Sequence, residues 1–307
     1  MKEFNEKTKE NYSAFGLNIA SDFVLDAFLP GEEAAEIEII NGKVPEDILD
    51  PLEKNVFFQT SKREFLFDVK GVAKFLVSDG KRMIIEPYEE ADDSKLKSYL
   101  YGTTFEILLL QRGMLAIHGS SVVVDGKCII ISGASGAGKS TLALALRQIG
   151  YPFLTDDVSF LSLSDDGTIW VCPGFPVHKL CRDSAEAVGI DIHSISHTYL
   201  RNENKYFLPV RYGYQEAPAR LFVLWELKAD ACNEVSITRL DGMQKLSVLL
   251  NHSFHGKFLS LFKREVENFK KLSSVAESIQ IYQMIRPQNI FTLEKQIKLI
   301  LKEIEEL

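Results

Sequence analysis

Nine residues, GASGAGKST at positions 133–141, constrain the fold of this chain more than any other segment. They match G-x-x-x-x-G-K-[ST], the pattern of a phosphate-binding loop (P-loop, Walker A). The apolar, β-branched run KCIIIS at 127–132 precedes them, and the helix-forming run LALALR at 142–147 follows them. Since a buried strand, a glycine loop and a helix are the context that this pattern requires, the sequence predicts an α/β domain that binds phosphate groups.

The residue types in this loop suit a nucleoside triphosphate. Three glycines let successive backbone N–H groups point inward, and the start of the helix adds its positive dipole end. Lys139 would neutralise the β- and γ-phosphates, and the Ser140 hydroxyl would sit on Mg²⁺. The predicted cofactors are therefore ATP and Mg²⁺, and the predicted nucleotide-binding residues are Gly133, Ala134, Ser135, Gly136, Ala137, Gly138, Lys139, Ser140 and Thr141.

Two adjacent carboxylates, Asp156 and Asp157, follow the next predicted strand. In a parallel α/β arrangement the end of that strand lies beside the phosphate loop. Asp156 is predicted to bind Mg²⁺ together with Ser140, directly or through water, and Asp157 to act as general base for an acceptor hydroxyl. A turn-forming Asp pair is the alternative. His118, which ends an earlier strand, would alone be read as a structural histidine.

Taken together, His118-Gly119, the loop at 133–140 and Asp156-Asp157 resemble the catalytic domain of the HPr kinase/phosphorylase family, over residues 113–180. The resemblance implies that Asp157 is the proton acceptor in phosphoryl transfer to serine. It also implies that His118 and Lys139 belong to the catalytic set, and that Ser140 binds Mg²⁺. It further implies the fold shared with phosphoenolpyruvate carboxykinase, a mixed sheet around the phosphate loop, and a homo-oligomer, by analogy a hexamer.

The segment after the Asp pair departs from this family. Where the family carries a metal-binding Glu, the chain has CPGFPVHKL at 172–180 with no Glu to match, which argues against a second Mg²⁺ site and against the reverse, phosphorolytic reaction. The pattern resembles more closely the HPr kinase-like proteins found outside sugar regulation, which include those that phosphorylate the C-terminal serine of lasso-peptide precursors. A basic set could receive such an acidic or carboxylate-ended peptide, namely Lys179, Arg182, Arg201, Lys205 and Arg211.

The pattern of apolar and polar residues changes along the chain, and this change predicts two domains. Residues 1–93 hold short alternating runs separated by turn signals such as Asn41-Gly42 and Asp79-Gly80, which indicate an antiparallel β-rich domain. An amphipathic helix is expected from Asp93 to Arg112. Residues 94–307 would form the catalytic domain with a helical C-terminal tail.

Within the second domain the expected strands alternate with turns. Before the loop, residues 115–118 and 121–124 are read as two strands, and a helix is expected to end at Gly150. Residues 221–227 and 234–240 are read as a strand pair. The tail from Lys257 is read as mostly helical, broken at Arg286-Pro287.

Composition limits the partners. The net charge of −8 argues against non-specific binding to nucleic acid or to an anionic membrane. No apolar run reaches membrane-spanning length, and the charged N-terminus lacks the hydrophobic stretch of a signal peptide, so a cytoplasmic protein is expected. The four cysteines are widely spaced, and the pairs His193/His197 and His252/His255 come without a third zinc ligand.

The sequence thus predicts a cytoplasmic ATP-dependent kinase that phosphorylates a serine hydroxyl on a peptide or small protein, with the terminal serine of a lasso-type precursor as the specific expectation. Its fold class would be α/β, an HPr kinase-like P-loop domain with a smaller β-rich N-terminal domain. Two alternatives stay open at this point. The chain could be a nucleotide-dependent switch or scaffold with slow ATPase activity, or a small-molecule kinase of the same fold.

Overall fold

The computed structural model describes residues 9–32, 34–191, 205–210, 212–253 and 265–307. These residues divide into two compact units, and the division falls at Met114. We call the part up to Met114 the N-terminal unit and the part from Leu115 the C-terminal unit. The helical segment after residue 93 is grouped with the N-terminal unit, whereas the boundary predicted from the sequence lies before that segment.

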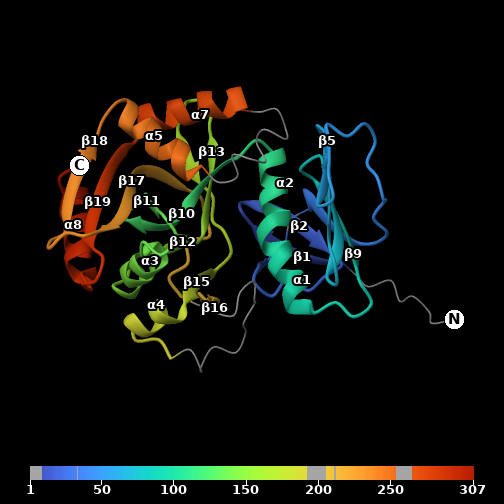
Figure 1. The fold of residues 1–307 in the computed structure, drawn as a ribbon, viewed down its shortest axis with the longest axis horizontal. Coiled ribbons are helices and arrows are strands. Elements are labelled where there is room, and N and C mark those ends of the chain that lie inside the picture. The colour runs from blue at the N-terminus through green and yellow to red at the C-terminus, as the bar shows by residue number, and fades with distance from the viewer. Residues whose placement is uncertain (1–8, 33, 192–204, 211, 254–264) are drawn as a thin grey trace. The chain divides into compact units, whose positions relative to one another are not determined.

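One large sheet forms most of the N-terminal unit (Figure 1). Its nine described strands run in the order β3-β1-β2-β4-β9-β8-β7-β6-β5. The expected antiparallel sheet is corrected to a mixed one, because β4 pairs in parallel with both β2 and β9. The strands are β1 (Glu10–Ala14), β2 (Leu17–Ser21), β3 (Leu29–Pro30), β4 (Ile37–Asn41), β5 (Glu53–Lys54), β6 (Phe58–Thr60), β7 (Glu64–Val69), β8 (Ala73–Ser78) and β9 (Arg82–Pro87).

The segment predicted as one helix from Asp93 to Arg112 is three helical pieces. They are α1 (Asp93–Tyr99), the π-helical turn η1 (Leu100–Thr104) and α2 (Phe105–Gln111). Asp92 caps α1 by accepting the backbone N–H of Lys95 at 2.9 Å. The interruption lies at Gly102, whose backbone leaves helical geometry (φ −99°, ψ −107°), a freedom that glycine has and bulkier residues lack. The segment packs on the sheet through Phe105, which contacts the rings of Phe15 and Phe28.

The C-terminal unit is built on a second mixed sheet, so the chain is an α/β protein with two large sheets. Its described strands follow the order β11-β10-β13-β14-β17-β19-β18, with β12 beside β10 and an extra pairing of β11 with β17. A separate ladder joins β15 and β16. The strands are β10 (Leu115–Val124), β11 (Lys127–Gly133), β12 (Phe153–Thr155), β13 (Val158–Leu163), β14 (Ile169–Val171), β15 (Val177–Cys181), β16 (Lys205–Pro209), β17 (Ala219–Asp230), β18 (Ser236–Leu240) and β19 (Gln280–Pro287).

Helices cover both faces of this sheet (Figure 1). One core contains residues of α5 and α7 such as Leu249 and Val275, and the other contains residues of α3 and α8 such as Leu142 and Ile300. Burial on both faces explains why strands such as β11 read as continuous apolar runs. The helices are α3 (Lys139–Gln148), α4 (Arg182–Ala187), α5 (Met243–His252), α7 (Glu265–Ser278) and α8 (Leu293–Glu305).

Three predictions about this unit are corrected. Residues 115–118 and 121–124 belong to one strand, β10, whose partner changes from β13 to β11 at Gly119. The expected strand pair β17 and β18 is separated by β19, which pairs with both. The described part of the tail, residues 265–307, is mostly helical as expected, but strand β19 separates its two helices, so Arg286-Pro287 ends a strand instead of breaking a helix. Pro287 is tolerated there because it is the last residue of the strand.

Candidate functional site

The glycine loop (Gly133–Gly138) has the predicted setting, since β11 ends at Gly133 and α3 begins at Lys139. Gly133, Gly136 and Gly138 all have φ in the left-handed range, at 147°, 81° and 104°. Only glycine adopts such angles freely, and at Gly133 a side chain would also collide with the carbonyl oxygen of Leu227. The N-terminus of α3 follows the loop directly, which is the arrangement that favours bound anions.

A small cavity of about 110 Å³ opens at this loop. Binding pockets for whole ligands are typically about 300–1,000 Å³, so the cavity matches a phosphate chain better than a complete nucleotide. It brings together residues of the loop and of the first turn of α3, one residue from each of the pairs His118-Gly119 and Asp156-Asp157, and two residues of β15. The lining residues are His118, Ser135, Gly136, Gly138, Lys139, Ser140, Thr141, Asp157, Lys179 and Cys181.

Asp156 is a completely buried carboxylate behind this cavity. Its Oδ1 accepts hydrogen bonds from the hydroxyls of Ser120 and of Ser140 (2.9 Å) and from the backbone N–H of Asp157 (2.8 Å). Its Oδ2 accepts the backbone N–H of Lys179 at 2.8 Å. Burial by itself would raise the pKa of Asp156, but the His178 imidazole and these hydrogen bonds outweigh burial and hold the pKa below its usual value. An ionised Asp156 thus fixes Ser140 at the first turn of α3.

Asp157 differs sharply from its neighbour. Its backbone has φ of 72°, a left-handed conformation that Asp tolerates better than most residues, and its carbonyl accepts the N–H of Gly119 at 3.1 Å. Asp157 lines the cavity, and about a quarter of its side chain is exposed. There Oδ2 lies 2.8 Å from Lys179 Nζ, and Oδ1 lies 3.9 Å from His118 Nδ1.

His118 and Lys139 also reach the cavity, as predicted from the sequence. Burial, and next the positive charge of Lys139, lower the pKa of His118, so its imidazole is neutral at pH 7. The next residue is a glycine because β10 passes close to β11 at this point. A side chain at position 119 would meet the Ile131 carbonyl oxygen at 2.7 Å. Lys139 Nζ donates to the carbonyls of Gly133 and Ala134, both at 3.0 Å.

Sequence reasoning missed the position of Lys179. It belongs to the basic set expected to receive a substrate tail, and in the structure its ammonium pairs with Asp157 at the cavity. Leu180 packs against Leu144 of α3 and so holds β15 in place. Arg182, from the same basic set, lies outside the cavity lining and donates to the Tyr206 hydroxyl at 2.9 Å. Arg201 and Arg211 lie outside the described residues, as does the Lys205 side chain.

A second buried carboxylate, Glu226, was also missed. It lies on β17 in register with Ser132, the residue before the glycine loop. Its side chain, 4% exposed, contacts His252 Nε2 at 3.0 Å, Gln283 Nε2 at 2.7 Å and Lys228 Nζ at 3.2 Å. Burial opposes ionisation, but these donors prevail and lower the pKa of Glu226 to about 2. The sequence signal was a single Glu within the apolar run LFVLWEL.

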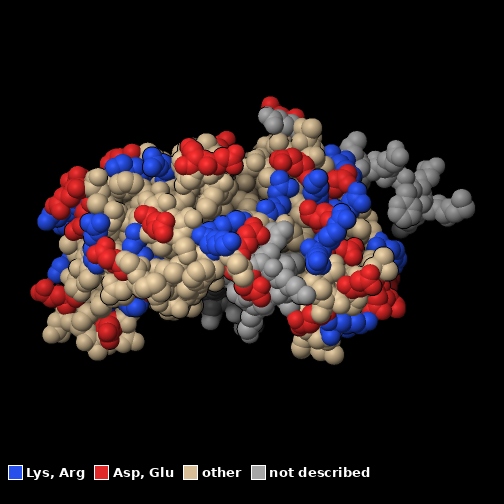
Figure 2. Space-filling model, turned by 90° about the horizontal axis from the view of Figure 1, so that it is seen from above, with Lys and Arg blue, Asp and Glu red and all other residues tan. Residues whose placement is uncertain are grey.

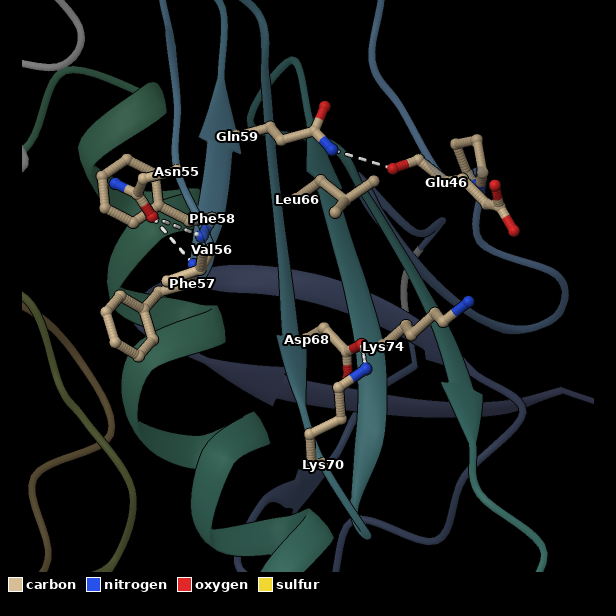
Figure 3. A pocket seen from close by; sticks show the side chains of 11 residues that line it. Glu46, Asn55, Val56, Phe57, Phe58, Gln59, Leu66, Asp68, Lys70 and Lys74 are labelled. Atoms are coloured by element: carbon tan, nitrogen blue, oxygen red, sulfur yellow. Dashed lines mark hydrogen bonds and ion pairs between the residues drawn. The ribbon is translucent and has the colours of Figure 1, made fainter.

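The N-terminal unit has a hollow of a different kind, of about 270 Å³ (Figure 3). Its wall combines exposed apolar side chains, Val56 and Phe57, with charges of both signs. Lys70 pairs with Asp68 at 2.6 Å, and Asn55 accepts the backbone N–H of Phe57 at 2.8 Å. No glycine lines this hollow, so it has nothing like the glycine loop of the other unit.

In the described part of the chain, no group of three or more His, Cys, Asp or Glu side chains is placed to hold a metal ion. His193, His197 and His255 lie outside the described residues. No described helix is long and apolar enough to cross a membrane. On the face shown in Figure 2, acidic and basic side chains are interspersed. Surface ion pairs such as that of Lys9 with Glu38 occur among the described residues.

Short segments of the chain are similar to curated proteins. A stretch of 65 residues is 43% identical to an HPr kinase/phosphorylase of Lachnoclostridium phytofermentans and covers 21% of each chain. A stretch of 85 residues is 36% identical to an HPr kinase/phosphorylase of Treponema pallidum, covering 28% of this chain and 26% of that protein. A third, of 55 residues, is 38% identical to that of Streptococcus thermophilus and covers 18% of each. The predicted resemblance to HPr kinase/phosphorylase is confirmed.

This likeness covers about a quarter or less of the relatives' own length. No family model matches the chain. A solved structure, the Hpr(Ser) kinase/phosphatase from Coxiella burnetii, aligns over 62% of this chain and 95% of its own with 13% identity and a TM-score of 0.35. A TM-score of that size does not establish a shared fold. The similarity to HPr kinase/phosphorylase therefore rests on the sequence segments.

Proposed function

We propose that this chain is an ATP-dependent kinase that transfers the γ-phosphate to a serine hydroxyl. The observation that carries the proposal is the Asp157 carboxylate, which lines the same small cavity as the glycine loop, Lys139 and Ser140. A carboxylate at this place would repel the phosphates and so would weaken a site built only to bind nucleotide. As the base for an acceptor hydroxyl it has a chemical use. The names of the relatives support the same reaction class.

The glycine loop and α3 would hold the nucleotide. Backbone N–H groups and the helix N-terminus favour the phosphate oxygens, and Lys139, kept at the loop by Gly133 and Ala134, adds a positive charge. Bound magnesium would neutralise charge on the β- and γ-phosphates, and the residues present fit it. Ser140 donates its proton to Asp156, which leaves the lone pairs of Ser140 Oγ available to the metal.

Asp156 would support the metal site mainly through Ser140. Its two oxygens already accept hydrogen bonds from Ser120, Ser140, Asp157 and Lys179. Since a carboxylate has about four lone-pair sites, a direct metal bond would replace one of these partners. We therefore propose an outer role for Asp156, at most through water, in place of direct ligation.

In the transfer step the serine oxygen attacks the γ-phosphorus. A new O–P bond forms, the bond from the γ-phosphorus to the bridging oxygen breaks, and ADP leaves with that electron pair. The hydroxyl proton passes to Asp157. The neutral His118 imidazole, 3.9 Å from Asp157, would help to orient the carboxylate or the γ-phosphate. Little covalent chemistry remains for the protein, so positioning and charge neutralisation would set the rate.

The acceptor is proposed as a serine of a peptide or small protein. HPr appears in the names of these three relatives, and none of the three is named for a lasso precursor. The test is incubation with ATP and Mg²⁺ and, in separate reactions, HPr or a serine-terminated peptide. We expect one acceptor to gain the mass of one phosphate, which fragmentation places on serine. ATP hydrolysis that leaves both acceptors unmodified would favour the switch or the small-molecule kinase instead.

A further inference from the structure

The inference concerns Lys179 and rests on the proposed kinase function. Its ammonium lies 2.8 Å from Asp157 Oδ2, so a cation directly neutralises the carboxylate that should accept the serine proton. A carboxylate held by a cation is a weaker base than one beside a neutral group. As a permanent arrangement this pair would oppose the role proposed for Asp157.

The surroundings of Lys179 point to a partner other than Asp157. Lys179 lines one cavity of about 110 Å³ together with Ser135, Gly136 and Lys139, so its ammonium and the glycine loop border the same small space. A phosphate chain on that loop would bring a doubly charged terminal group into this space. A γ-phosphate offers more negative charge and more acceptor oxygens than one carboxylate, so it competes well for the ammonium.

The backbone of Lys179 is fixed independently of its side chain. Its N–H donates to Asp156 Oδ2 at 2.8 Å, and the following residue, Leu180, is buried against α3. The four-carbon side chain can therefore change partners while β15 stays in place. Only about a fifth of that side chain is exposed, so its ammonium would change partners away from bulk solvent. Contacts between charges are stronger there than in water.

We propose that Lys179 is an exchangeable cation of this site: it pairs with Asp157 in the free enzyme and turns to the γ-phosphate when ATP binds. The exchange would free the Asp157 carboxylate for the acceptor hydroxyl at the moment when the phosphate to be transferred is present. ADP has no γ-phosphate and would leave the Lys179–Asp157 pair intact. The site would thereby distinguish ATP from ADP.

The test compares ATP and ADP affinity by calorimetry in the wild type, Lys179→Met and Lys179→Arg. We expect Lys179→Met to weaken ATP about tenfold or more, the loss of one charged hydrogen bond, with ADP affinity unchanged. Lys179→Arg should recover most of the ATP affinity. Lys127→Met serves as the control, since Lys127 lies over the Phe222 ring at the far end of β11 and should change neither affinity.

Equal weakening of ATP and ADP by Lys179→Met, or no change in either, would overturn the proposal. A wild type that binds neither nucleotide would instead defeat the proposed kinase function, and the inference with it. Lys179 can also be followed in the wild-type chain by quantifying amine labelling with mass spectrometry, which requires no variant. Protection of Lys179 by ATP and not by ADP supports the exchange, and equal protection by both contradicts it.

Discussion

The two units differ in how deeply they bury the carboxylates of their ion pairs. In the N-terminal unit, carboxylates such as Glu38 and Asp79 lie at the surface, each with 41% of its side chain exposed, and pair with exposed lysine or arginine. In the C-terminal unit, Asp156 and Glu226 are 0% and 4% exposed and are surrounded by hydrogen-bond donors. Surface pairs contribute little to stability, whereas burying a charge is costly unless it is fully paired.

This difference indicates which unit carries the chemistry. Replacing a whole buried ion pair by apolar side chains of similar size is often neutral or even stabilising, so stability alone rarely explains why a fold buries one. Buried charge concentrated beside a glycine loop is therefore best explained by chemistry, and perturbed pKa values there support that explanation.

The largest effect is expected for Lys139→Ala. Because Lys139 is proposed to contact the triphosphate, its loss should lower ATP turnover by about a hundredfold or more while the chain stays folded. The measurement is steady-state ATP consumption, with circular dichroism as the check on folding. Lys54→Ala, which removes an exposed lysine paired with Asp47 in the N-terminal unit, is the control and should leave turnover unchanged. Undiminished turnover in a folded Lys139→Ala chain would remove the glycine loop from the mechanism.

Asp156→Asn should both destabilise the C-terminal unit and reduce turnover. Both oxygens of Asp156 accept hydrogen bonds, so either orientation of an asparagine amide would place its NH₂ group against a donor. Such a mismatch at a buried site costs about 1–3 kcal/mol. Urea unfolding followed by tryptophan fluorescence measures it selectively, since both tryptophans, Trp170 and Trp225, lie in the C-terminal unit. Wild-type stability would show that Asp156 is not the anchor described here.

Much of this site could be predicted from the sequence because its parts are close together along the chain. The strand, the glycines and Lys139 form one continuous motif, and Asp156-Asp157 follow after a single helix. A contiguous pattern of this kind predicts the local geometry of the strand, loop and helix directly. The mixed α/β class followed from the same alternation of strands and turns.

Long-range pairing could not be predicted in the same way. β19 lies between β17 and β18 in the sheet, although it follows β18 by about forty residues in the sequence. No local sequence pattern predicts this position. The contact of Lys179 with Asp157 depends on β15 crossing beside α3, and that of Glu226 with His252 depends on where α5 ends. In the N-terminal unit the turn signals located strands but gave no information on which neighbours are parallel.

Glu226 gives a stability effect that depends on pH. Its pKa falls from 4.5 to about 2 in the folded state, so its ionised form contributes stability that is fully present above pH 4.5 and is lost as the pH falls toward 2. This difference in pKa corresponds to about 3 kcal/mol. Glu226→Gln should lower the free energy of unfolding by up to this amount at pH 7, and by progressively less between pH 4.5 and pH 2. A gap between wild type and variant that does not shrink on acidification would contradict the assignment.

The smallest effect is expected in the N-terminal unit. Glu38→Gln removes an exposed carboxylate that pairs with Lys9 and Arg82, both at 3.1 Å, and should change stability by less than about 1 kcal/mol. Unfolding of the C-terminal unit, followed by tryptophan fluorescence, and ATP turnover should both stay unchanged. Hydrogen exchange across β4 and β9 is the sensitive measurement. A loss as large as that of Glu226→Gln would erase the contrast between the two units.

The central claim is that Asp157 acts as the base while Lys139, Ser140 and the glycine loop hold the nucleotide. Asp157→Asn tests it most directly, because asparagine tolerates the left-handed backbone at this position and keeps the shape of the side chain while losing its proton affinity. Two quantities are measured on the same protein, ATP–Mg²⁺ affinity by calorimetry and phosphoryl transfer to the acceptor in a single turnover. We predict that affinity is retained and that transfer falls by about a hundredfold or more. Transfer near the wild-type rate, or lost nucleotide binding in place of lost transfer, would contradict the account.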